Sequence, residues 1–102
     1  MISLAPQSQT SCYLVTVPSD DNAQYGRAMW DDVAGALERG ERHVIVDCAE
    51  WHRLDLRFLS ALVRCARACG EQGAVFELMN VQEHVRADLR QLRLDSRVGL
   101  QS

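Results

Sequence analysis

Acidic residues at the ends of apolar runs are the first candidates for chemistry in this sequence. Asp47 closes one such run, and Asp20 and Asp21 follow another. So placed, Asp20 and Asp21 could form an acidic pair that binds Mg²⁺ beside Asp47 as a phospho-accepting aspartate. However, such a site needs two crossover units between its acids, and the interval between Asp21 and Asp47 has room for one helix. In addition, all 11 basic residues are arginine. A site that needs a lysine is therefore excluded, and Asp47 is expected to accept hydrogen bonds from nearby backbone.

Histidines and cysteines are the next candidates. His43, His52 and His84 are scattered over three predicted elements, and no pair has the helical spacing of a metal site. The cysteines form no Cys-x-x-Cys pair, so we expect them to be small buried hydrophobic residues, and we expect neither a metal nor another cofactor. They are Cys12, Cys48, Cys65 and Cys69. A small enzyme or redox protein that uses Asp47, His52 and the cysteines remains an alternative.

Ser60 is the serine of the central segment. A nucleophilic serine needs a base within hydrogen-bond reach, and the sequence provides none for Ser60. The chain also has no Gly-x-Gly-x-x-Gly motif. We therefore predict that the protein is not an enzyme.

The central segment, residues 43–70, predicts a buried strand followed by a core helix. Residues 43–48 contain the β-branched run Val44, Ile45 and Val46 and are too few for a helix. From residue 56 to about Gly70, apolar residues recur at helical spacing, at Phe58, Leu62, Cys65 and Cys69. Asp55 lies at the expected N-cap, where a carboxylate accepts backbone N–H bonds and favours the helix dipole.

The rest of the chain predicts further alternation of strands and helices in a single domain, residues 1–102. Strands are expected at 12–17 and 74–79, and helices at 23–39 and from Asn80 onward, with Glu83 completing a capping box. A short strand at 2–4 would pair with 12–17 as a hairpin. The predicted fold class is therefore α/β, a single-layer mixed sheet of about four to five strands with three to four helices packed on it.

Composition excludes several kinds of partner. A net charge of −3 and a pI near 5.5 argue against nucleic acid, because no excess of positive charge is available to meet phosphates. No apolar run approaches 18 residues, so membrane insertion is not expected. Since the N-terminus lacks basic residues and a long apolar core, we expect no secretory signal and a cytoplasmic location.

The strand, the turn and the acid-headed helix together resemble the STAS domain, named after sulphate transporters and anti-sigma-factor antagonists. The family signature is Asp-Ser-Ser-Gly-Leu followed by small and apolar residues. In this chain Asp55 and Leu59 match it, as does the continuation at residues 60–62. The two serines and the glycine are replaced by Leu56, Arg57 and Phe58.

This resemblance implies a bacterial regulatory module with a STAS-like (anti-anti-sigma) fold that acts in signal transduction and regulation of transcription. Its partner would be an anti-sigma factor or a histidine-kinase-like ATPase. In the family the first serine after the aspartate is phosphorylated and switches binding; Leu56 stands there, so the usual switch should be absent. The alternative is a STAS subunit of a lipid or anion transporter complex, and a homodimer stays open.

The resemblance places partner binding on the turn and the start of the central helix. We expect an exposed surface on which Trp51 and arginines serve as anchors, since both are enriched at interfaces. For Leu56, burial in the core is an equally weighted alternative. The predicted binding residues are Trp51, His52, Arg53, Asp55, Leu56, Arg57 and Ser60.

Overall fold

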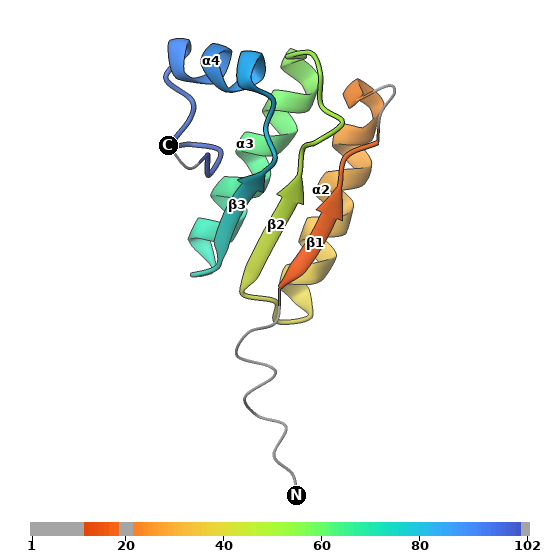
Figure 1. Ribbon diagram of the computed structural model, residues 1–102. Helices are drawn as coiled ribbons and strands as arrows, with labels where there is room; N and C mark the ends of the chain where they lie inside the picture. Colours follow the sequence, from red (N-terminus) through yellow and green to blue (C-terminus); the bar gives the residue numbers. More distant parts are fainter. Residues whose placement is uncertain (1–11, 19–21, 101–102) are drawn as a thin grey trace, which may run out of the picture.

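A computed structural model of the chain describes residues 12–18 and 22–100. Strands and helices alternate along it, as the sequence predicts (Figure 1). The predicted bounds of the strands at 12–17, 43–48 and 74–79 and of the first two helices hold to within one or two residues. The elements are β1 (Tyr13–Thr16), α2 (Asn22–Glu38), β2 (His43–Asp47), α3 (Leu56–Glu71), β3 (Val75–Met79) and α4 (Glu83–Gln91).

The three strands form one sheet in the order β1-β2-β3, and both pairings are parallel. Parallel neighbours need crossover connections, and α2 and α3 are these crossovers. The α/β class is confirmed. The described sheet has fewer strands than the four to five expected, and it is parallel rather than mixed. The antiparallel strand predicted at 2–4 lies outside the described residues.

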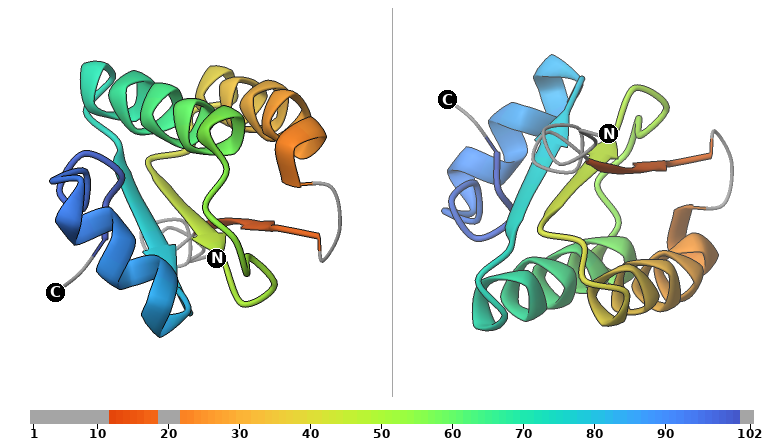
Figure 2. Two further views of the ribbon diagram at one scale, coloured as in Figure 1. Left: turned by 90° about the horizontal axis from the view of Figure 1, so that it is seen from above. Right: turned by 90° about the horizontal axis from the view of Figure 1, so that it is seen from below.

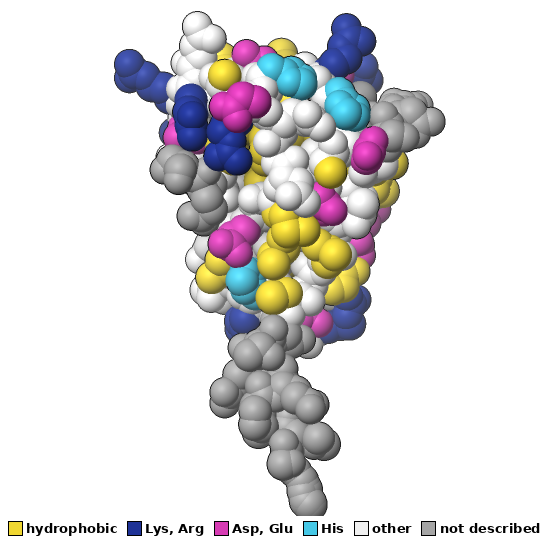
Figure 3. Space-filling view, in the orientation of Figure 1, with side chains coloured by type: hydrophobic (Ala, Val, Ile, Leu, Met, Phe, Trp, Pro, Cys, Tyr) yellow, Lys and Arg dark blue, Asp and Glu magenta, His cyan; other side chains and the backbone are white. Residues whose placement is uncertain are grey.

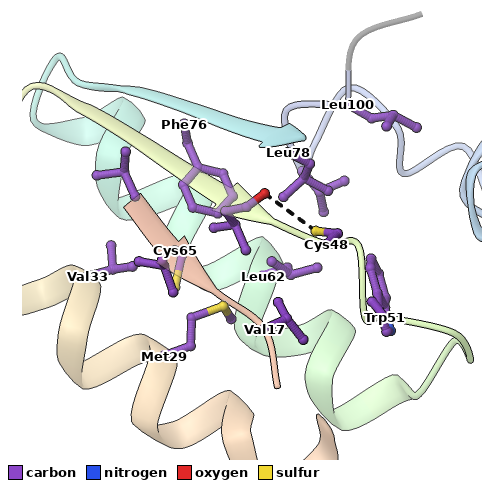
Figure 4. Packing of buried hydrophobic residues seen from close by; sticks show 14 of the residues in the cluster. Val17, Met29, Val33, Cys48, Trp51, Leu62, Cys65, Phe76, Leu78 and Leu100 are labelled. Carbon is purple, nitrogen blue, oxygen red and sulfur yellow. Dashed lines mark hydrogen bonds between the residues drawn. The ribbon is translucent and has the colours of Figure 1, made fainter. Parts of the chain in front are cut away.

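Helices α2 and α3 lie side by side on one face of the sheet (Figure 2). The predicted apolar face of α3 is confirmed, since Phe58, Leu62, Cys65 and Cys69 are all buried. They meet the inward side chains of the strands and of α2, including Val46 and Met29, in one core cluster (Figure 4). Burial of apolar surface between these two layers is the main force that holds the fold together.

The opposite face of the sheet carries exposed apolar residues. Leu14 on β1 and Val75 on β3 are 54% and 51% exposed. Hydrophobic side chains gather over the strands in the view onto this face (Figure 3).

Helix α4 and the segment after it lie beside β3, at the edge of the sheet. Leu100 forms a parallel bridge with Leu78, and Val98 is buried, so the segment after α4 packs against β3 as a short strand-like piece. Gly99 has a φ of 75°, and a Cβ built there would lie 2.1 Å from the Phe76 carbonyl oxygen. Only glycine fits so close to β3.

The predicted capping box at the start of α4 is wrong. Gln82, not Asn80, is the residue before the helix, and it makes no side-chain cap. Asn80 adopts a left-handed φ of 62°, and its side chain donates to Asp47 Oδ1 over 3.2 Å. Asparagine tolerates this backbone region better than most residues, so Asn80 turns the chain out of β3 instead of capping α4.

A left-handed turn ends α4 without a glycine. Arg93 has a φ of 61°, and the backbone N–H groups of Arg93 and Leu94 donate to the carbonyl oxygens of Arg90 and Leu89. Glycine usually occupies this position because a Cβ is strained there. The substitution Arg93→Gly should therefore raise the free energy of unfolding by up to about 1 kcal/mol.

Chemical denaturation monitored by circular dichroism measures this effect. Arg90→Gly is the matched control, since the same substitution inside α4 should lower stability by about 1 kcal/mol. If Arg93→Gly destabilised the protein as much as Arg90→Gly does, the left-handed end of α4 would be incorrect.

Candidate functional site

The turn between β2 and α3 is anchored by Trp51. The prediction that Trp51 is exposed is wrong, because its side chain is 0% exposed and its ring meets the Phe58 ring edge-on, with centroids 4.9 Å apart. Figure 4 shows Trp51 in the same cluster as Cys48 and Leu62. Aromatic residues bury large apolar areas and favour such edge contacts. Trp51 therefore fixes the turn from below and cannot itself touch a partner on the surface.

Asp55 fixes where α3 begins. Its backbone is extended, and its Oδ1 accepts hydrogen bonds from the backbone N–H groups of Arg57 and Phe58, at 2.8 and 3.2 Å. The predicted N-cap is confirmed. Because the cap satisfies N–H groups that the helix cannot, it sets both the first residue of α3 and the direction in which that residue points.

The first residue of α3 is Leu56, and it projects into solvent. Its side chain is 72% exposed, more than any other large hydrophobic residue described. Burial of Leu56 in the core, the other possibility from the sequence, is thus excluded. Arg57 and Ser60 are also exposed, and so the start of α3 presents an apolar, a cationic and a hydroxyl side chain together.

His52 and Arg53 are both exposed on the turn that precedes α3. His52 Nε2 lies 3.5 Å from Glu50 Oε1. Of the seven predicted binding residues, six are thus wholly or partly accessible, and Trp51 alone is buried.

Side chains from the N-cap and the first turn of α4 hold the same turn from the side, which sequence reasoning missed. Gln82 Nε2 donates to the Ala49 carbonyl oxygen over 2.7 Å, and His84 Nε2 lies 2.5 Å from the His52 carbonyl oxygen. The turn is therefore held by Trp51 from beneath and by Gln82 and His84 from the side. The signal was the polar run after β3, which pattern reasoning assigned to helix capping.

A groove between α2 and α3 adjoins the start of α3, and sequence reasoning missed it too. Arg57 and Ser60 line it from α3, while Arg27 and Trp30 line it from α2. The available signal was the spacing of polar residues on α3, at positions 57, 60 and 64, which places them on one helix face. The groove brings two predicted binding residues together with two that were not singled out.

Among the residues of the alternative enzyme or redox function, Asp47 is held by hydrogen bonds and three of the cysteines are buried. Asp47 Oδ1 accepts hydrogen bonds from the Ala49 backbone N–H, at 3.1 Å, and from Asn80, as expected for a strand-end acid. Cys48, Cys65 and Cys69 are buried. Over residues 12–18 and 22–100, no cluster of three or more His, Cys, Asp or Glu side chains could hold a metal ion.

The buried thiols should be unreactive in the folded protein. Burial raises the pKa of Cys48 and of Cys65 to about 12, with the neighbouring charge of Asp47 and the thiol of Cys69 adding to it respectively, and burial also raises the pKa of Cys69. Since the thiolate is the nucleophile, iodoacetamide at pH 8 should modify the exposed Cys12 and spare the other three.

Intact-mass spectrometry gives one adduct for the native protein under this account and four after denaturation in guanidinium chloride. Rapid modification of two or more cysteines under native conditions would show that the α3 thiols or Cys48 are accessible, and it would reopen the redox alternative.

The Asp55 cap gives a second prediction. Asp55→Ala removes both acceptor bonds and should lower the free energy of unfolding by about 1 kcal/mol, whereas Asp55→Asn retains a capping oxygen and should lose less. Urea denaturation followed by circular dichroism measures both variants. Equal stability of Asp55→Ala and wild type would mean that the cap does not fix the start of α3.

Comparison with known proteins identifies the fold and the family of this chain. The NMR structure of the protein TM1081 superposes with a TM-score of 0.76 at 18% sequence identity, covering 89% of this chain and 74% of that one, which shows a shared fold. The search of curated proteins gave no significant match. In the part of the chain that the structure describes, no helix has the length and apolar character needed to cross a membrane. A family profile described as "Mlab, STAS domain" matches residues 5–101, and the chain therefore belongs to the STAS domain family.

Proposed function

We propose that this protein is a non-enzymatic regulatory STAS module that binds a protein partner. Binding uses the Leu56 surface, which we define as His52, Arg53, Leu56, Arg57 and Ser60. The partner we propose is an anti-sigma factor or a histidine-kinase-like ATPase. STAS domains generally mediate protein–protein interactions, and the family assignment supports this class of function.

The observation that carries the proposal is the position of Leu56. It is 72% exposed at the first turn of α3, on the residue that follows the capping Asp55. The family resemblance puts a phosphorylated serine there, at the surface through which antagonists meet their partners. A single exposed leucine is common on proteins, but the resemblance aligns this one with the serine whose phosphorylation switches partner binding in the family.

The same position argues against the family's usual switch. A phosphate would add about −1.5 to −2 charges beside a helix N-terminus, and leucine cannot accept one. Ser60, one turn further along, is exposed, but it lies outside the capped first turn. We therefore propose that binding at this surface is not controlled by phosphorylation of residue 56.

The missing phosphoacceptor also favours a second candidate, a STAS subunit held permanently in a lipid or anion transporter complex. Such a subunit needs a binding surface but no switch at residue 56. It would use the same Leu56 surface, so the identity of the captured partner separates the two candidates. An enzymatic or redox role is not proposed, because the buried thiols are protonated at neutral pH and Asp47 is engaged by Ala49 and Asn80.

Affinity capture from native lysate with Leu56→Glu tests the proposal. Burying a leucine side chain contributes about 1.5–3 kcal/mol, so its replacement by a charge should reduce capture of the specific partner at least tenfold. The fold should survive, because an acid is favourable in the first turn of a helix. Quantitative mass spectrometry of the captured proteins is the measurement.

Leu92→Glu is the matched control, since Leu92 is a leucine 50% exposed at the far end of α4. It should capture the partner as wild type does, and thermal melts should show both variants folded. The Leu56 surface is wrong if the two variants lose the partner equally, or if neither loses it.

A further inference from the structure

The groove between α2 and α3 has an unusual charge for this protein. Its volume is about 410 Å³, and three of its lining residues are arginines, against a single carboxylate. The whole chain, by contrast, carries a net charge of −3. The charged and aromatic lining residues are Arg27, Trp30 and Asp31 from α2 and Arg57 and Arg64 from α3.

Small residues let the two helices approach closely beneath these side chains. Gly26 and Ala61 also line the groove, and a Cβ built on Gly26 would lie 3.1 Å from the Ala61 Cβ. Both helices lie on the same face of the sheet (Figure 2). The long side chains on either side therefore form the walls of an open trough.

The guanidinium groups of the groove carry charge that no carboxylate of the described residues neutralises. In the described residues, neither Arg27 nor Arg57 nor Arg64 lies within ion-pair distance of a carboxylate. Arg64 instead lies over the Trp30 ring, 4.2 Å from its centroid. A cation–π contact of this kind orients the guanidinium without neutralising it.

We propose that this groove receives an acidic segment of the protein partner that binds the Leu56 surface. This inference rests on the proposed function, and it adds the chemistry of the partner. A guanidinium matches a carboxylate with two parallel hydrogen bonds, and three arginines that form no ion pair with the described residues suit a segment with more than one carboxylate. Asp31 lies on the same groove and disfavours an acid beside it, which limits where the segment can lie.

Continuity and size favour a peptide segment over a small free anion. Arg57 and Ser60 belong both to the groove and to the Leu56 surface, so one partner segment can contact the two at once. The volume lies in the range of sites that hold a ligand of many atoms. The partner is therefore expected to carry two or more acidic side chains next to an apolar residue that packs on Leu56.

The two tryptophans allow this to be tested by NMR on ¹⁵N-labelled protein. The indole N–H resonance of Trp30 reports on the groove, and that of the buried Trp51 is an internal reference. The probe is the peptide acetyl-Glu-Asp-Glu-Leu-amide, titrated to millimolar concentration. Its controls are the uncharged acetyl-Gln-Asn-Gln-Leu-amide and inorganic phosphate at the same ionic strength.

We expect the acidic peptide to shift the Trp30 resonance in a saturable way and to leave that of Trp51 in place. Neither the uncharged peptide nor phosphate should do so at the same concentration. The double variant Arg27→Gln/Arg64→Gln should weaken the response at least fivefold. The matched double variant Arg67→Gln/Arg90→Gln removes the same charge from exposed positions outside the groove, and it should respond as wild type does.

Three results would overturn the inference. The first is the absence of any shift at Trp30. The second is an equal shift with phosphate, which would indicate a site for small oxyanions. The third is equal weakening by the two double variants, which would indicate general charge attraction. None of these results involves Leu56 or a captured protein. A negative result in the peptide titration would exclude an acidic partner segment in the groove. The lysate experiment with Leu56→Glu would still decide the proposed function.

Discussion

The structure depends on the burial of Trp51 beneath the first turn of α3. This tryptophan lies in a turn whose neighbouring side chains are polar, yet it is withdrawn completely from solvent and packs edge-on against Phe58. Burying so large a side chain is worth several kcal/mol. It fixes the chain between β2 and α3, and Asp55 can then cap the helix at one defined residue.

The surface that we propose for binding follows from this anchoring. Once Asp55 sets the start of α3, Leu56 must point outward, while Phe58 and Leu62 point into the core. Gln82 and His84 tie the turn to the start of α4. A surface held from beneath and from the side is preorganised, and preorganisation reduces the entropy that binding would otherwise cost.

The secondary structure and the helix cap were predictable because their causes are local. A β-branched run specifies β2, the spacing of Phe58, Leu62, Cys65 and Cys69 specifies the buried face of α3, and an aspartate before a helix caps it. The burial of Trp51 was not predictable in this way. One aromatic residue in a polar turn belongs to no periodic pattern. The residue that packs against Trp51 is Phe58, which lies beyond the turn on α3.

Features formed between distant segments were also missed, for the same reason. Asn80 was assigned to a capping box because the residues that follow it fit one, but contact with Asp47 on the neighbouring strand decided its conformation. The groove arises only when α2 and α3 pack together, and no single stretch of sequence contains it. Parallel sheets bring such distant segments together routinely, because each crossover separates neighbouring strands by a helix.

Site-specific photo-cross-linking from residue 56 tests the central claim most directly. A photoreactive phenylalanine analogue in place of Leu56, activated in cells, should form a covalent adduct with one defined protein, and the same analogue in place of Leu92 should not. A specific adduct from position 56 alone is the predicted result. Adducts from position 92 with the same protein, or none from position 56 while the protein still captures its partner, would show that binding occurs on another face.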